Sequence, residues 1–105
     1  MALTLKHIQD TIYIAYKQHG YEKNWNDSGK IGDIAKLGLI ITEVSEAIEE
    51  IRKPNMNSKN LAFECADIII RVLNFASRKN INCEIAIKEK HKINMKRGFL
   101  HGKDV

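Results

Sequence analysis

The sequence contains little proline, glycine and cysteine, and it has no long apolar run. One proline and six glycines in 105 residues argue against a disordered chain and against short strands joined by turns. No apolar run approaches the roughly 20 residues that a membrane helix needs, and residues 1–6 lack a secretory signal. We therefore expect a reduced, cytoplasmic protein.

The two cysteines, Cys65 and Cys83, are not accompanied by a histidine–cysteine cluster with zinc spacing. Cys65 lies in a very apolar stretch, so we expect it in the core. Neither cysteine is assigned a chemical role.

Charge is unevenly distributed along the chain. The formal net charge is +4, with an acidic middle and a basic C-terminal segment. A run of charged residues most often forms a solvent-exposed face. An acidic centre with a basic tail would also suit an anionic ligand that binds to the acidic residues through bound cations. The basic residues near the end are Lys88, Lys90, Lys92, Lys96, Arg97 and Lys103.

Apolar residues recur at three- and four-residue steps, which predicts an all-α chain of four main helices. The expected helices cover about 4–18, 31 or 33 to 52, 59 or 60 to 78, and 83–96. Thr4, Ser58 and Asn82 are the expected N-caps, and Pro54 ends the second helix. The segment 21–31 is expected to be a loop containing Trp25, which could pack on the domain or stack on a flat ligand.

Two acidic pairs lie at the centre of the sequence, Glu43 with Glu46 and Glu64 with Asp67. The i,i+3 spacing puts both carboxylates of a pair on one face of a helix, and Glu50 continues the first stripe. Carboxylates on two neighbouring helices suit a hard divalent cation. The alternative is a pair of solvated acidic faces.

The apolar residues around Glu64 and Asp67 favour the cation site over the solvated face. Glu64 and Asp67 lie in a narrow polar strip of a helix that is apolar nearly all round, and such a helix is expected to be buried. A buried carboxylate without a partner is costly. Arg71 could form a structural Arg–carboxylate cluster there, but one arginine cannot balance all four acidic residues, whereas a divalent metal can.

Three stretches together resemble a known family, the MazG-like nucleoside triphosphate pyrophosphohydrolases of the all-α NTP pyrophosphatase group. They are the Glu-x-x-Glu helix at 39–52, the Glu-x-x-Asp helix at 64–71, and a C-terminal signature over 90–103 with Lys90, Asn94, Arg97 and His101-Gly-Lys103. Gly98, where the family often has proline, and the Asp104-Val105 ending depart from it. The resemblance covers roughly residues 34–103.

The resemblance implies a fold, a cofactor and a reaction. The fold is a four-helix bundle-like subunit, a single all-α MazG-like domain over 1–105 with a basic C-terminal tail at 97–105. The cofactor is Mg²⁺, for which Mn²⁺ could substitute. The reaction is cleavage of an NTP or dNTP to the monophosphate and pyrophosphate, in house-cleaning of the nucleotide pool.

The same resemblance suggests roles for individual residues. The expected metal ligands are Glu43, Glu46, Glu64 and Asp67. Glu46 is the first choice as general base and Glu50 the second, while Arg71 is expected to orient Glu64 or Asp67. The expected substrate-binding residues are Lys90, Asn94, Arg97, Lys103 and Trp25.

Three further expectations concern partners and the alternative function. An apolar third helix has too few partners within 105 residues, so we expect a homodimer or homotetramer assembled through helix packing between subunits. A catalytically silent helical module that binds nucleotides or a protein is the alternative function. Nucleic-acid binding through 88–103 is disfavoured by the acidic centre.

Overall fold

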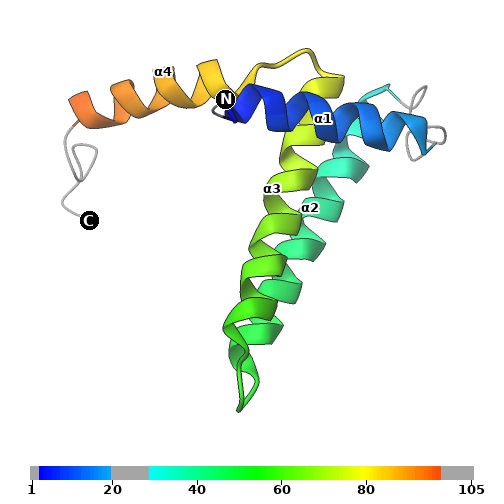
Figure 1. Ribbon diagram of the computed structural model, residues 1–105, viewed down its shortest axis with the longest axis vertical. Helices are drawn as coiled ribbons and strands as arrows, with labels where there is room; N and C mark the ends of the chain where they lie inside the picture. The colour runs from blue at the N-terminus through cyan, green and yellow to red at the C-terminus, as the bar shows by residue number, and fades with distance from the viewer. Residues whose placement is uncertain (1–2, 20–28, 98–105) are drawn as a thin grey trace.

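The computed structural model describes residues 3–19 and 29–97. Within these ranges the chain forms four helices and no strand: α1 (Leu5–Gln18), α2 (Gly29–Arg52), α3 (Ser58–Arg78) and α4 (Cys83–Lys96). The all-α class is therefore confirmed for the described residues. Helices α2 and α3 lie side by side as an antiparallel hairpin, α1 crosses one end of it, and α4 extends away from that end (Figure 1). Trp25 and Lys103 lie outside the described residues.

Side-chain caps fix the helix starts. The Thr4 side chain accepts a hydrogen bond from the backbone N–H of His7, and the Asn82 side chain accepts one from Ile85, so both predicted caps are confirmed. The predicted cap at Ser58 is wrong. The Asn57 side chain caps α3, and Ser58 is the first helical residue. Asparagine is as good an N-cap as serine, and its longer side chain accepts from the backbone N–H groups of both Lys59 and Asn60.

Helix α2 begins earlier than the sequence predicts. It starts at Gly29 rather than at residue 31 or 33, so the last residues of the predicted loop at 21–31 are helical. Gly29 has a φ of +56°, a conformation that residues with a side chain rarely adopt. A glycine in this left-handed conformation therefore stands at the start of the helix, where sequence patterns predict a turn.

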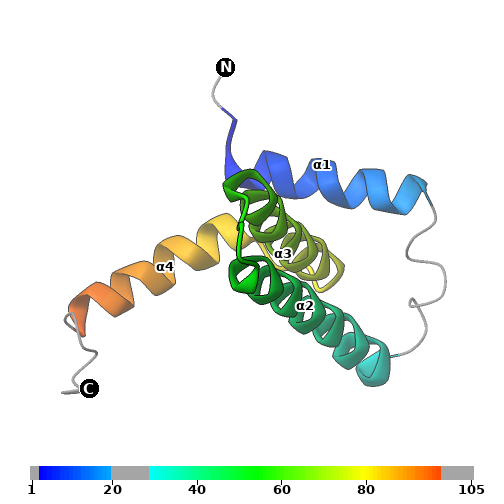
Figure 2. The same ribbon diagram turned by 90° about the horizontal axis from the view of Figure 1, so that it is seen from below.

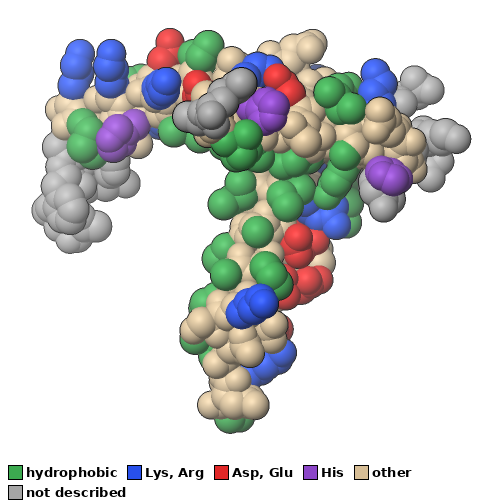
Figure 3. Space-filling model, in the orientation of Figure 1, with side chains coloured by type: hydrophobic (Ala, Val, Ile, Leu, Met, Phe, Trp, Pro, Cys, Tyr) green, Lys and Arg blue, Asp and Glu red, His purple; other side chains and the backbone are tan. Residues whose placement is uncertain are grey.

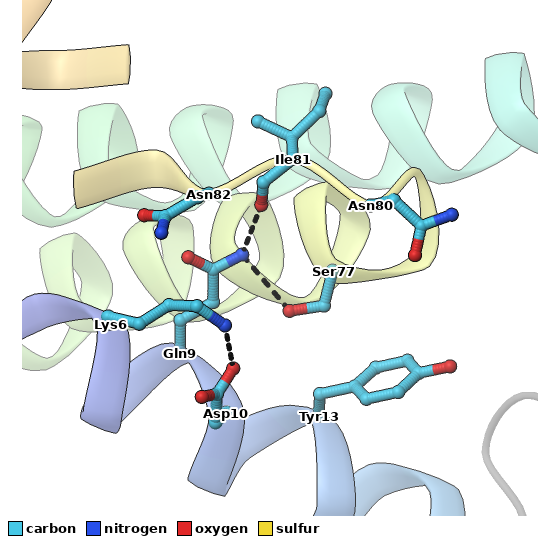
Figure 4. A pocket seen from close by; sticks show the side chains of 8 residues that line it. All are labelled: Lys6, Gln9, Asp10, Tyr13, Ser77, Asn80, Ile81 and Asn82. Atoms are coloured by element: carbon cyan, nitrogen blue, oxygen red, sulfur yellow. Dashed lines mark hydrogen bonds and ion pairs between the residues drawn. The ribbon is translucent and has the colours of Figure 1, made fainter. Parts of the chain in front are cut away.

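A glutamine joins α1 to the turn between α3 and α4. Gln9 is 1% exposed. Its Nε2 donates to Ser77 Oγ at 3.0 Å and to the Ile81 carbonyl at 2.8 Å, and its Oε1 accepts from the Cys83 backbone N–H at 3.1 Å. Figure 4 shows the two Nε2 contacts at one side of a cleft of about 390 Å³. These three hydrogen bonds set where α1 crosses the hairpin.

The acidic face of α2, not its apolar face, packs against α3. Glu43, Ala47 and Glu50 are the buried residues along the middle and end of α2. The apolar arc on the other side of the helix is exposed, at Leu37, Ile41, Val44, Ile48 and Ile51. The alternative of a solvated face therefore does not hold for Glu43, which pairs with Arg71, or for Glu50, which accepts hydrogen bonds from Lys53 and from the Asn57 backbone in the connecting loop. Glu46 is exposed.

Helix α3 is much less buried in the single chain than its composition predicts. Its buried residues are Leu73, Asn74 and Ala76, near its C-terminal end. Phe63 and Ile69 are exposed, and so is Cys65, which was expected in the core. Hydrophobic side chains accordingly lie along the surface of the hairpin (Figure 3). The sequence predicts which residues avoid water, but one chain does not contain enough other helices to cover them.

None of the helices in the described part of the chain is both long enough and apolar enough to cross a membrane.

Candidate metal centre

Three carboxylates from two helices meet at the contact between α2 and α3, where Glu43 is buried, Glu64 is half-buried and Asp67, which the sequence placed in a buried helix, is exposed. Glu43 belongs to α2, and Glu64 and Asp67 belong to α3. One carboxylate oxygen from each residue lies within 4.8 Å of the other two. The i,i+3 spacing on α3 supplies two of the groups from one helical face, and the antiparallel packing of α2 brings the third. Three converging oxygen donors suit Mg²⁺ or a similar hard cation.

Arg71 contributes positive charge to the acidic cluster. Its Nε donates to Glu43 Oε2 at 2.6 Å, across the interface between α3 and α2. The side chain of Glu43 is 12% exposed and that of Arg71 is 41% exposed. We expected Arg71 to orient Glu64 or Asp67 on its own helix, and instead it holds Glu43 on the facing helix. An arginine side chain is long enough to reach across a helix pair, which spacing along one helix does not reveal.

Glu64 has a buried carboxylate oxygen among several other acidic side chains. Its Oε1 is buried and has no hydrogen-bond partner among the described residues. The pKa of Glu64 is raised from its ordinary value, first by burial and then by the neighbouring charges of Glu46, Asp67, Glu43 and Glu50. Arg71 therefore leaves negative charge uncompensated at Glu64. The donor set and this oxygen fit a divalent cation.

Glu46 lies beside the three-residue cluster rather than within it. The cluster whose oxygens converge to 4.8 Å consists of Glu43, Glu64 and Asp67. Glu46 is exposed, and with Glu64 it lines an open cleft of about 310 Å³ between α2 and α3. Its carboxylate is close enough to raise the pKa of Glu64. Glu46 is thus placed to act next to a bound ion, from the solvent side.

Glu50 is engaged in the connection between the two helices. It is 4% exposed, and its Oε2 accepts from the Asn57 backbone N–H at 2.9 Å while its Oε1 accepts from Lys53 Nζ at 3.0 Å. The hydrogen bond from Asn57 and the contacts with Lys53 lower the pKa of Glu50. The sequence did not predict this role. The Lys53 contact at i,i+3 could have been suspected, but the Asn57 contact depends on the path of the loop.

The expected phosphate-binding residues lie on a different part of the molecule. Lys90, Asn94 and Arg97 follow one another at i, i+4 and i+7, which places them on one face of α4 and at its C-cap. Helix α4 leaves the hairpin at the α1 end, so these residues do not lie with the acidic cluster of the same chain (Figures 1 and 3). All three belong to the described residues, whereas their expected companions Lys103 and Trp25 do not.

Several residues along the acidic cleft were not singled out from the sequence. Thr42, Ser45, Glu49 and Lys53 line the cleft together with Glu46 and Glu64. All four lie on one side of the acidic stripe of α2 at about 100° per residue, and this is the signal that could have identified them.

Comparisons with protein-family models, with curated proteins and with solved structures each find no match for this chain. The functional argument therefore depends on the residues and geometry described above and on the resemblance of the sequence motifs.

Proposed function

We propose that the protein is a Mg²⁺-dependent nucleoside triphosphate pyrophosphohydrolase, which cleaves an NTP or dNTP to the monophosphate and pyrophosphate. The observation that carries the proposal is the convergence of Glu43, Glu64 and Asp67, in which a buried Glu64 oxygen lacks a partner among the described residues. The resemblance to the MazG-like motifs supplies the reaction type. Mn²⁺ is expected to substitute for Mg²⁺, because it favours the same oxygen ligands.

The three clustered carboxylates are the proposed metal ligands, and Glu46 is a fourth that would join from the cleft. A bound divalent ion neutralises phosphate charge and lowers the pKa of coordinated water. Of these four residues, Glu64 and Glu46 line the open cleft of about 310 Å³, and this cleft is the proposed entry for the triphosphate. Without a cation the same residues would repel the substrate.

We assign the general base to Glu46. Its carboxylate is exposed on the cleft next to the cluster, where it could accept a proton from an attacking water. Glu50, the second choice from the sequence, is a poorer candidate because Asn57 and Lys53 occupy its oxygens and its pKa is lowered.

The proposed phosphate contacts require more than one chain. Lys90, Asn94 and Arg97 lie on α4, away from the acidic cluster of their own chain. We propose a homodimer or homotetramer in which α4 of one copy approaches the cluster of another, and in which these side chains hold the outer phosphates. A cytoplasmic role in cleaning the nucleotide pool belongs to the same proposal.

Product analysis tests the reaction. Purified protein with Mg²⁺ is incubated with a panel of canonical and modified nucleoside triphosphates, and monophosphate and pyrophosphate are expected together. Glu64→Gln and Asp67→Asn should lose turnover, while Glu89→Gln, an exposed carboxylate change on α4, should keep it. Release of inorganic phosphate alone, no turnover of any nucleotide, or full Mg²⁺-dependent activity in both cluster variants would contradict the proposal.

A catalytically silent nucleotide- or protein-binding module is the second candidate. The ion pair between Arg71 and Glu43 favours it, because it shows that part of the cluster is already neutralised by the protein. Titration with Mg²⁺ separates the two candidates. A purely structural cluster predicts no heat of Mg²⁺ binding and no thermal stabilisation by the ion, whereas the enzyme predicts both, and both should disappear in Glu64→Gln.

A further inference from the structure

Helix α4 carries the expected phosphate-binding residues but buries none of its own side chains. It begins beside the start of α1 and extends away from the hairpin (Figures 1 and 2). Most helices in proteins are held in place by packing of an apolar face, and no face of α4 is buried in the single chain. The direction of α4 therefore depends on the contacts at its first turn.

Glu84, the second residue of α4, reaches the start of α1. Its Oε1 accepts a hydrogen bond from the backbone N–H of Lys6, which is the second residue of α1, at 2.9 Å. The N–H groups in the first turn of a helix have no partner inside the helix. The Thr4 side chain accepts the N–H of His7. The start of α1 is thus capped by a neighbour in sequence and by a residue of α4.

The charge of Glu84 acts on two helices at once. Glu84 belongs to the first turn of α4, and its carboxylate also lies at the first turn of α1. Negative charge is favourable at the N-terminus of a helix, and an ionised acceptor strengthens a hydrogen bond. The Glu84 side chain is 26% exposed, so water screens these interactions only in part.

Gln9 supplies a second attachment between α1 and the start of α4. Its Oε1 accepts from the Cys83 backbone N–H at 3.1 Å, and its Nε2 donates to the Ile81 carbonyl in the preceding turn at 2.8 Å. Gln9 lies three residues after Lys6, so both are on one face of α1. This face binds two successive residues of α4, Cys83 and Glu84. Two attachments restrain the direction of α4 as well as the position of its first residue.

We propose that Glu84 is a positioning residue, which together with Gln9 fixes the direction of α4. That direction sets where the proposed phosphate-binding side chains lie, at Lys90, Asn94 and Arg97. Arg97 is about 20 Å along the helix from Glu84 at 1.5 Å per residue, so a change of direction at the first turn is largest there. The inference depends on the proposed function only in that these three side chains bind phosphate.

Loss of the Glu84 contact should weaken substrate binding more than it slows the reaction of bound substrate. If α4 takes several directions, only a fraction of the molecules presents its side chains correctly, and the apparent affinity falls by that fraction. For the nucleoside triphosphate that the unchanged protein hydrolyses best, we expect Glu84→Ala to raise KM about tenfold and to leave kcat within about threefold. A role in stability alone predicts fewer folded molecules, which lowers kcat at an unchanged KM.

Two variants complete this measurement. Glu84→Gln keeps an acceptor for the Lys6 N–H but loses the charge, so its KM should lie between those of Glu84→Ala and the unchanged protein; it replaces Glu84→Ala if that variant does not fold. Glu89→Ala removes an exposed carboxylate of the same helix and should leave KM unchanged. A KM equal to that of the Glu89 control in the Glu84 variants, or a fall in kcat at unchanged KM, would overturn the proposal.

A distance measurement tests the direction of α4 without any nucleotide. Cys65 and Cys83 are first replaced by serine, and spin labels are then attached through Gln18→Cys, at the exposed end of α1, and Lys92→Cys, on the exposed part of α4. The labelled protein is mixed with an excess of unlabelled protein, so that dipolar spectroscopy reports the distance between the labels of one chain.

We expect one narrow distance distribution in the labelled protein and in its Glu89→Ala form, and a broader distribution in its Glu84→Ala form, or in Glu84→Gln if the alanine variant does not fold. Distributions of equal width would overturn the proposal. Absence of turnover in the unchanged protein would instead contradict the proposed function, and the label distances would still decide whether Glu84 holds α4 in one direction.

Discussion

Arg71 and Glu43 join the two helices of the hairpin through a hydrogen bond of 2.6 Å between Nε and Oε2. The pair neutralises one carboxylate of the acidic cluster and leaves Glu64 with a buried oxygen that has no partner in the described residues. Arg71 thus supplies positive charge to one of the three converging carboxylates. This imbalance is the basis of the first two predictions below.

Loss of Arg71 should make the protein more dependent on metal. Arg71→Gln leaves Glu43 without its cation, so we expect unfolding in the absence of metal to become easier by about 1–3 kcal/mol. Mg²⁺ should then stabilise the variant more than the unchanged protein, because it can replace the lost charge. Urea unfolding with and without Mg²⁺ measures both effects.

Lys88→Gln is the control for that measurement, since Lys88 forms an exposed pair with Glu84 at 3.7 Å, which should contribute little. A variant at Arg71 that is no more responsive to Mg²⁺ than the Lys88 variant would indicate a purely structural ion pair.

Glu64 should destabilise the metal-free protein as the pH rises. Its pKa is raised above the ordinary value of 4.5 by burial and nearby carboxylates, so the folded state holds the proton more tightly than the unfolded state. Stability is therefore greatest below the unfolded pKa and falls as the pH rises towards the folded pKa. At neutral pH without metal, Glu64→Gln should be more stable than the unchanged protein.

The greater stability of Glu64→Gln over the unchanged protein should shrink in acid, where Glu64 is protonated. It should disappear or reverse when Mg²⁺ is added at neutral pH. Thermal unfolding from pH 4 to 7 with and without the ion would check it. Equal stability of the two proteins throughout would mean that Glu64 is solvated.

Glu50 should show the opposite pH dependence. Its pKa is lowered by the Asn57 backbone N–H and by Lys53, so its stabilising effect is present above the unfolded pKa of about 4.5 and is lost as the pH falls through the folded value. We expect Glu50→Gln to lower the melting temperature at neutral pH by a few degrees. The difference should vanish in acid.

Glu49→Gln, at the exposed residue that precedes Glu50 on α2, is the matched control. If both variants melt together at neutral pH, the contact with the loop does not contribute to stability.

Gln9 should be more important for stability than Gln18, the other glutamine of α1. Gln9→Leu leaves the Ile81 carbonyl, the Ser77 hydroxyl and the Cys83 N–H without this partner, and unpaired buried polar groups cost about 1–3 kcal/mol. Gln18→Leu, at the exposed end of the same helix, should change stability little. Chemical denaturation of the two variants measures the difference, and similar values for both would refute a role for Gln9 in positioning α1.

Local structure was predictable because its causes are local. The caps at Thr4 and Asn82 and the end of α3 at Arg78 depend on a few neighbouring residues. The cap of α3 was misplaced by one residue because Asn57 and Ser58 are both good caps, and only the backbone path decides between them. Burial was harder to predict, as the exposed residues Cys65 and Phe63 show. The apolar composition of α3 indicates that its residues tend to avoid water. Their exposure depends on how many other helices pack against α3.

Helix periodicity predicts the four helices and the shared face of Glu64 and Asp67, because it fixes which residues of one helix are neighbours. Packing between helices brings Glu43 to these two residues, lets Arg71 reach Glu43, and brings the Glu50 carboxylate to the backbone of the connecting loop. Packing also makes α2 present its acidic face to α3 and leaves its apolar arc exposed. The rotation of a helix about its axis depends on contacts between residues far apart in sequence, and a single helical pattern does not contain that information.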